Sequence, residues 1–132
     1  MQLVQNEPKY WEFIRELRND PRVKDGFIQQ SHITPKQHCD YMVIHGAFFY
    51  VCLVSGFPAG FVRVLDSDIG VCTHPDFQKK GIAKFMVNEI MKKYPQAVAK
   101  IKIENEASIK LFESCGFKKK YFLLEKEHPD AA

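Results

Sequence analysis

The sequence predicts one mixed α/β domain, in which helices pack against a single sheet. Segments with helical hydrophobic spacing alternate with short aromatic and β-branched runs along the chain. The 132 residues suffice for one hydrophobic core, and the strand–helix–strand order in the second half requires a parallel crossover. The predicted order is β-α-α-β-β-β-α-β-α-β, with the domain at residues 1–126 and a frayed polar tail at 127–132.

The first half of the chain predicts an opening strand, two helices and an antiparallel meander. Residues 8–19 place apolar side chains at the i, i+3, i+4 and i+7 positions of one helical face. Thr34 and Pro35 are typical of a helix N-cap and first turn, and Gly46 ends this second helix. Turn-forming residues then separate three strands, at Phe48–Val54, Ala59–Leu65 and Ile69–Thr73.

The second half predicts helices and strands in alternation. Residues 78–94 repeat apolar side chains at helical spacing, with the helix proper beginning near Gly81 and Pro95 ending it. Gly116 suits the left-handed position that follows a helix. The remaining elements are a strand, a helix and a last strand, at Val98–Ile103, Asn105–Ser114 and Phe117–Glu125.

Composition and charge predict a soluble cytoplasmic protein that binds neither membranes nor nucleic acids. No apolar run approaches the roughly 20 residues that span a bilayer, and the N-terminus lacks the basic start and apolar core of a secretory signal. Four cysteines without a Cys-x-x-Cys pair are typical of reduced thiols. The net charge of +3 is spread over short basic groups, whereas a nucleic-acid interface concentrates its charge.

The loop between the third meander strand and the next helix carries the most informative pattern. Gln78-Lys79-Lys80-Gly81-Ile82-Ala83 lies where this helix begins. A helix N-terminus offers unpaired N–H groups and the positive end of its dipole to a pyrophosphate, and the small residues let a ligand approach the backbone. The sequence contains neither the dinucleotide Gly-x-Gly-x-x-Gly spacing nor the P-loop spacing.

This loop resembles the Gln/Arg-x-x-Gly-x-Gly/Ala loop of the GNAT N-acetyltransferases, and Pro75-Asp76-Phe77 precedes it as Pro-Glu-Tyr does in that family. A second block, residues 104–117, is similar to the family's Asn-x-x-Ser/Ala helix ending in Gly-Phe. The resemblance covers nearly the whole chain and implies the GNAT fold, with acetyl-CoA as co-substrate.

The resemblance also implies which residues contact acetyl-CoA. The backbone of the third meander strand would meet the pantetheine arm, the loop would hold the pyrophosphate, and Lys110 or Lys79 would meet the 3'-phosphate. Asn105 would contact the pantetheine, while its own position also suits a helix N-cap. The implied coenzyme-binding positions are Val71, Cys72, Thr73, Gln78, Lys79, Lys80, Gly81, Ile82, Ala83, Asn105, Lys110 and Phe112.

The implied chemistry is direct attack of a neutral amine on the thioester, without a metal. Many family members place a Tyr near Phe112 to protonate the leaving thiolate, and Ser108, one helical turn earlier, is the substitute donor here. Glu104 is the favoured general base and His38 is its rival. None of the five histidines, His128 included, forms a metal-like spacing with further ligands.

The acceptor and the partners are open to alternatives. Leu17–Val23 and Ile33–His38 are similar to the opening of family members that acetylate nucleotide-linked amino sugars. Members that acetylate ribosomal proteins and other protein N-termini share parts of these patterns, and a catalytically silent acyl-CoA-binding domain is the third hypothesis. The family closes with two strands after Gly-Phe, whereas this chain has room for about one, so a second copy could complete the sheet edge as a homodimer.

Overall fold

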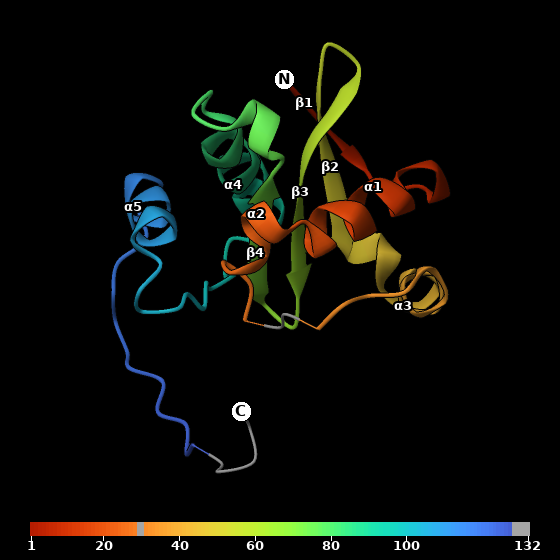
Figure 1. Cartoon of the computed structure of the whole chain (residues 1–132). Coiled ribbons are helices and arrows are strands. Elements are labelled where there is room, and N and C mark those ends of the chain that lie inside the picture. The colour runs from red at the N-terminus through yellow and green to blue at the C-terminus, as the bar shows by residue number, and fades with distance from the viewer. Residues whose placement is uncertain (29–30, 128–132) are drawn as a thin grey trace.

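A four-stranded antiparallel sheet, ordered β1-β2-β3-β4, forms the centre of the structure (Figure 1). The structure is a computed structural model that describes residues 1–28 and 31–127. The predicted tail from residue 128 on, with His128, therefore lies outside the described residues. The strands are β1 (Gln2–Gln5), β2 (Phe49–Val54), β3 (Phe57–Leu65) and β4 (Asp68–Thr73).

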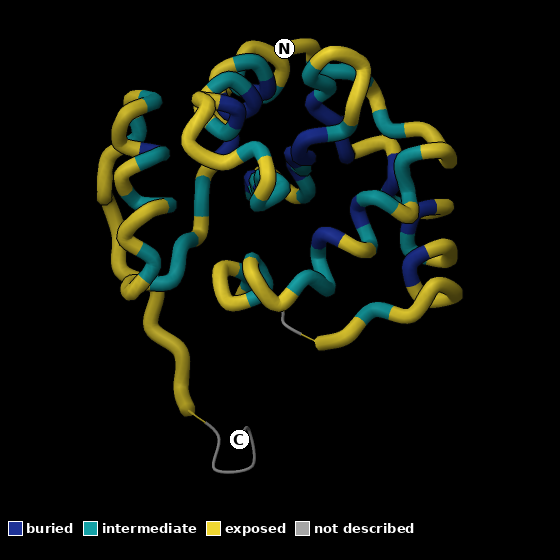
Figure 2. Tube along the Cα trace, turned by 45° about the horizontal axis from the view of Figure 1, so that its top comes forward, coloured by how far each residue is buried: buried dark blue, intermediate teal, exposed yellow. Residues whose placement is uncertain are grey.

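Helices cover both faces of this sheet. On one face, α1 and α3 bury a cluster with Phe49, Phe61 and Cys72, and on the other face α4 and α5 bury a cluster with Val62 and Ile69. Figure 2 shows the buried residues concentrated between these layers. None of the described helices is long and apolar enough to cross a membrane. The helices are α1 (Pro8–Asn19), α2 (Pro21–Lys24), α3 (Pro35–His45), α4 (Ile82–Lys93) and α5 (Glu106–Ser114), with 3-10 turns η1 (Gly46–Phe48) and η2 (Pro75–Phe77).

The mixed α/β fold and the antiparallel meander are confirmed, and local capping explains why several bounds were predictable. The Thr34 side chain accepts a hydrogen bond from the Gln37 N–H, and the Gln37 side chain accepts one from the Thr34 N–H, which forms a capping box at the start of α3. Gly116 adopts the predicted left-handed conformation at φ +94°. Helix α2 was missed, because four residues are too few for a hydrophobic period.

Two predicted strands are wrong: neither 98–103 nor 117–125 forms a strand. After α4, the chain makes one parallel bridge, between Asp68 and Val98, and then leaves β4. The last segment runs away from the sheet and helices (Figure 1). Both segments have β-prone composition, but a strand forms only where a neighbouring backbone completes its hydrogen bonds.

Close approach of β3 to β4 depends on Gly60. A Cβ built on Gly60 would lie 2.6 Å from the Cys72 carbonyl oxygen and 2.9 Å from Cε of Met86. Gly70, on the partner strand, differs, because a Cβ there would lie 3.1 Å from Nη2 of Arg63, the end of a flexible side chain. Because residue 60 has no side chain, the backbone of β4 can lie this close to β3.

We expect Gly60→Ala to lower the free energy of unfolding by about 1–3 kcal/mol, because the new methyl group meets backbone that cannot move aside. Gly70→Ala is the matched control, since Arg63 can move its side chain and the loss should stay below about 1 kcal/mol. Urea denaturation of both variants measures the difference. An equal loss of unfolding free energy in the two variants would show that the close contact at Gly60 adds no destabilisation of its own.

Candidate active site

Strand β4 has an open edge over its second half. At its start, the Val98 N–H donates to the Ser67 carbonyl at 2.8 Å, and the Ile69 N–H donates to the Val98 carbonyl at 2.9 Å. Backbone groups of a strand point to the same edge at every second residue, so the N–H groups of Val71 and Thr73 point to the edge that Ile69 uses. No described segment pairs with β4 at these two positions, which leaves donors and acceptors available to a ligand.

Side chains at the end of β4 divide between packing and the open edge. Cys72 is buried in the cluster beneath α1 and α3, and burial raises the pKa of its thiol to about 12. Thr73 is half-buried, and its Oγ1 is buried without a hydrogen-bond partner among the residues that the structure describes. Cys72 therefore offers a ligand no thiolate, and its backbone groups point to β3, whereas Thr73 has an unused hydroxyl beside the open edge.

The loop after β4 ends in an uncapped helix N-terminus. Gly81 is the N-cap of α4 at φ +77°, without a side-chain capping bond, and a Cβ there would meet nothing within 4 Å. Lys79 also adopts a left-handed conformation, at φ +63°, and the whole of residues 78–81 is exposed. Ile82 is buried and Ala83 half-buried at the first turn of the helix. The first N–H groups of α4 thus face open space beside two lysines, which suits an anion.

Helix α5 places the predicted residues of the second block in different surroundings. The Asn105 side chain accepts a hydrogen bond from the Ser108 N–H at 3.2 Å and so caps the helix. Ser108 is half-buried, Lys110 is exposed, and Phe112 is buried in the core, edge-on to Phe117. The helix cap expected for Asn105 is confirmed, and Phe112 contributes packing but no acidic hydroxyl.

The two candidate bases lie in contrasting environments. Glu104 is exposed on a turn before α5, and the strand that was expected to end beside it is not formed. His38 is 3% exposed on α3, and its Nε2 has no hydrogen-bond partner within the described part of the chain. Burial lowers the pKa of the His38 imidazole. The structure does not bring His38 and Ser108 together, since α3 and α5 pack in different core clusters.

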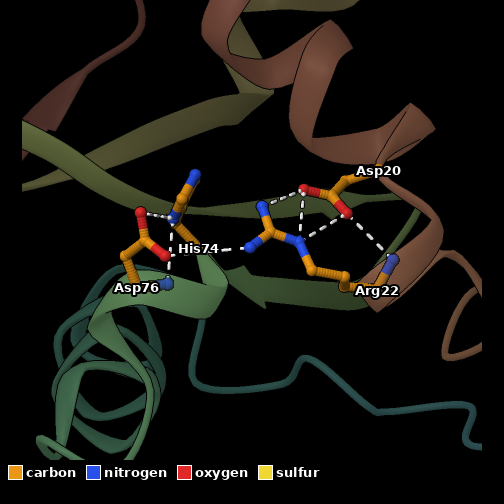
Figure 3. Close-up of polar contacts among 4 residues, drawn as sticks. All are labelled: Asp20, Arg22, His74 and Asp76. Atoms are coloured by element: carbon orange, nitrogen blue, oxygen red, sulfur yellow. Dashed lines mark hydrogen bonds and ion pairs between the residues drawn. The ribbon is translucent and has the colours of Figure 1, made fainter.

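A polar network that the sequence did not predict joins α2 to the turn after β4 (Figure 3). Nη2 of Arg22 lies 2.7 Å from the Asp20 carboxylate, and Nη1 lies 3.7 Å from the Asp76 carboxylate. The Asp76 N–H donates to Nδ1 of His74 at 3.1 Å. Hydrogen bonds from the Arg22 side chain and backbone hold the pKa of Asp20 at about 2. Two segments quoted from the sequence contain most of its residues, Leu17–Val23 and Pro75-Asp76-Phe77, but no contact between them was predicted.

This network borders a cavity of about 530 Å³ at the end of β4. The cavity lies between α1, the start of β3 and the turn η2. It combines three carboxylates with three phenylalanine rings, contributed by Glu16, Asp20, Asp76, Phe13, Phe57 and Phe77. Arg22 is the one lysine or arginine in its lining. Its acidic and aromatic walls suit an organic cation.

A smaller cavity, of about 270 Å³, lies at the opposite end of β4, beside the 66–67 turn and residues 94–97. It shares no residue with the loop at residues 78–81. The described residues contain no group of three or more His, Cys, Asp or Glu side chains that could hold a metal ion.

Comparison with known proteins identifies the family. The model of the acetyltransferase (GNAT) family matches residues 11–117. The chain belongs to this GNAT family. It is therefore an acyltransferase by family, as the resemblance of the 78–83 loop implied. No curated protein sequence is significantly similar to the chain.

Solved structures, among them two N-acetyltransferases, share the fold. The spermidine N-acetyltransferase of Vibrio cholerae, solved with CoA and spermine, superposes with a TM-score of 0.81 at 18% identity, over 95% of this chain and 85% of that one. The ribosomal-protein-alanine N-acetyltransferase of Brucella melitensis gives 0.76 at 14% identity, over 89% and 85%. A domain from Methanocaldococcus jannaschii gives 0.77 at 23% identity, over 90% and 88%. At these identities the likeness concerns the fold.

Proposed function

We propose that this GNAT protein transfers the acetyl group of acetyl-CoA to a primary amine by direct attack in a ternary complex. One observation carries the proposal: the open edge of β4 leads, through the turn η2 and the loop at residues 78–81, to the uncapped N-terminus of α4. A pantetheine arm needs backbone partners in a row, and a pyrophosphate needs a cluster of free N–H groups. The chain supplies these two features in that order within residues 71–83.

The residues present fit acetyl-CoA. The pantetheine amides would pair with the backbone of Val71 and Thr73, and the Cys72 thiol would stay in the core. Gln78 to Ala83 would surround the pyrophosphate, with the positive charges of Lys79 and Lys80 beside it. Asn105 and Lys110 would complete the site from α5. The unpartnered Oγ1 of Thr73 is the polar atom that such a ligand would satisfy.

We expect Gly81→Glu to weaken coenzyme A binding by at least roughly 100-fold, because a carboxylate would occupy the open space and repel the pyrophosphate. Gly56→Glu is the matched control, since Gly56 has a similar φ of +82° and equally open surroundings in the turn between β2 and β3. Titration calorimetry with coenzyme A compares the two variants. Unchanged affinity in a folded Gly81→Glu protein would refute the proposed pyrophosphate site.

Direct transfer requires three events: the amine loses a proton, the thioester oxygen gains negative charge, and the coenzyme thiolate leaves. A thiol with a pKa of about 12 does not supply a thiolate nucleophile at neutral pH, so Cys72 is a poor candidate for a covalent intermediate. We propose that Ser108 donates a hydrogen bond to the leaving thiolate, in place of the family's Tyr. Full turnover by Cys72→Ala would be consistent with direct transfer, whereas a kinetically competent acetylated cysteine would exclude it.

We propose Glu104 as the general base, acting through a water molecule, and His38 as its rival. Primary amines, with reference pKa values from about 8 for an α-amine to about 10.4 for an alkyl amine, are mostly charged at neutral pH, and a base contributes about 10²-fold to 10⁴-fold. Glu104 is exposed and precedes Asn105, so its carboxylate can contact a water molecule there. His38 has a lowered pKa because it is buried, so its imidazole is neutral at pH 7. It would become protonated, and so cease to act as a base, only at a pH below the ordinary pKa of histidine.

We expect Glu104→Gln to lower the rate at neutral pH and to recover part of it at higher pH, where more of the amine is already neutral. His38→Gln should leave the shape of the pH profile unchanged. The profile of kcat/KM from pH 5 to 9.5 measures both variants, with coenzyme affinity as the control. A wild-type profile for Glu104→Gln, with loss of the acidic limb in His38→Gln, would transfer the role to His38.

The cavity bordered by Asp20 and Asp76 is the proposed acceptor site. Its carboxylates favour an acceptor that carries positive charge beyond the reacting amine. The nucleotide-linked amino sugar suggested by the opening sequence carries a diphosphate, which these carboxylates would repel. We therefore propose a small cationic amine as the acceptor, with a protein N-terminus as the second candidate. The four free cysteines are consistent with action in the cytoplasm.

An amine panel tests this proposal through release of free coenzyme A thiol. The panel contains spermidine, a peptide with N-terminal alanine, a neutral amino sugar and a nucleotide-linked amino sugar. We expect the highest kcat/KM with spermidine, and a KM for it raised roughly three- to tenfold by Glu16→Gln or Asp76→Asn.

The control for the acceptor test is Asp40→Asn, which removes an exposed carboxylate from α3, away from the cavity. Preference for the nucleotide-linked sugar, or equal KM changes in all three variants, would reject the cationic acceptor. Absence of thiol release with every amine, in a protein that binds coenzyme A, would instead favour a catalytically silent binding domain.

A further inference from the structure

Two neighbouring arginines lie over the start of β4, on the face of the sheet that α1 and α3 cover. Arg63 follows Phe61 by two residues on β3 and pairs with Gly70 of β4. Side chains alternate along a strand, so Arg63 shares the face of Phe61, which packs beneath α1 and α3. Arg18 reaches this face from the last turn of α1. Burial, and after it repulsion from the Arg63 guanidinium, lower the pKa of Arg18.

A glycine on β4 makes room for the Arg63 side chain. A Cβ built on Gly70 would lie 3.1 Å from Nη2, 3.5 Å from Nε and 3.7 Å from Cζ of Arg63, so the guanidinium lies directly over this residue. Gly70 is not among the glycines with a positive φ, and its backbone therefore does not require glycine. The absence of a side chain at residue 70 thus positions the guanidinium and forms no turn.

The two guanidinium groups share a single carboxylate. Nη2 of Arg63 lies 3.5 Å from Oδ2 of Asp68, which is long for a charge-assisted hydrogen bond. The other oxygen of Asp68, Oδ1, is buried without a partner in the described part of the chain. Arg18 places Cζ 5.5 Å from the centre of the Phe27 ring and forms no ion pair within residues 1–28 and 31–127. The acidic groups that act on Arg18 are the hydroxyl of a tyrosine and the thiol of a cysteine.

Both guanidinium groups remain accessible to a ligand. The Arg63 side chain is 26% exposed, and Arg18 is half-buried. Among the described residues, no arginine nitrogen is fully buried without a hydrogen-bond partner. A partly buried charge is screened less by salt than an exposed one, so an anion placed between these groups is attracted more strongly than at a surface lysine.

We propose that Arg18 and Arg63 bind an oxyanion, the carboxylate or phosphate group of a small ligand, over the start of β4. Each guanidinium offers a planar pair of donors that matches two oxygens of such a group. The bound anion relieves the repulsion between the arginines and pairs the one that lacks a carboxylate. The site does not rest on the acceptor cavity, which is lined by carboxylates and lies at the end of β4.

Titration with inorganic phosphate, followed by NMR through the arginine Nε–H signals, tests the site. The proposed coenzyme loop at residues 78–83 contains no arginine, so phosphate bound there does not contact these groups. We expect the signals of Arg18 and Arg63 to shift with one dissociation constant, on the order of 1 mM for so small a ligand. Acetate, the carboxylate probe, should shift the same two signals. Sodium chloride at equal ionic strength is the control titration.

Variants of opposite expected sign make the titration specific. Arg63→Gln and Arg18→Gln should each weaken phosphate binding at least about tenfold, measured on the arginine that remains. Gly70→Ala should weaken it roughly threefold or more without altering net charge, because the methyl group displaces the Arg63 guanidinium. Asp68→Asn should tighten it, since it removes the carboxylate that competes for Arg63. Lys92→Gln is the control, because it removes one charge from α4 on the other face of the sheet.

A matched pair of amines tells whether the anion belongs to the acceptor or to a separate ligand. Putrescine is ornithine without its carboxylate. If the anion belongs to the acceptor, Arg63→Gln raises the KM for ornithine roughly tenfold and leaves that for putrescine unchanged. A separate anion leaves the ratio of the two KM values unchanged. This comparison rests on the proposed acetyl transfer, whereas the phosphate titration needs no activity, so inactivity with both amines would count against the proposed function alone.

Two results of the titration would overturn the anion site. One is the absence of a shift in both arginine signals with phosphate and with acetate. The other is a phosphate affinity that Gly70→Ala, Asp68→Asn and Arg63→Gln change no more than Lys92→Gln does. Circular dichroism gives the unfolding temperature of each variant. Should Arg18→Gln not fold, Gly70→Ala and Asp68→Asn decide the question, because they keep both arginines and are expected to act in opposite directions.

Discussion

Two backbone hydrogen bonds, from Val98 to Ser67 and from Ile69 to Val98, join β4 to the chain that returns from α4. They close the crossover at its start, and the two segments part immediately afterwards. Lys102 joins the departing segment to the chain that follows α2, because its Nζ donates to the Asp25 carbonyl at 2.8 Å. The open edge of β4, and with it the path to the α4 N-terminus, follows from this early parting. A full parallel ladder would occupy the backbone groups that a ligand needs.

Backbone groups and side chains alternate in direction along β4, so neighbouring residues have different roles. Val71 and Thr73 direct backbone groups to the open edge, while Cys72 between them packs its thiol beneath α1 and α3. Gly60 lets β3 approach this strand closely, so the edge is held by a close-packed neighbour. The site therefore depends on core packing as much as on the residues that would touch the coenzyme. The same strand leads into the turn that carries Asp76, which places the acidic cavity beside the proposed coenzyme loop at residues 78–83.

Sequence reasoning succeeded where local physics decides the structure. Thr34 with Pro35 specifies a helix start, and Gly81 suits a left-handed N-cap, so the starts of α3 and α4 could be predicted from a few residues. It failed at 98–103 and 117–125, where β-prone composition suggested strands but pairing depends on distant backbone. The cavity was missed because Glu16, Phe57 and Asp76 come from three separate parts of the chain. No local pattern indicates that such residues converge.

One aromatic contact holds the start of the C-terminal segment against α5. Phe117 is half-buried and lies edge-on to Phe112, with ring centroids 5.1 Å apart, so the first residue of the extended segment is held in the core through α5. Asn105 and Ser108 stand at the other end of that nine-residue helix. Because a helix is a rigid element, α5 fixes the distance between the anchored start of this segment and Asn105, one of the proposed coenzyme contacts.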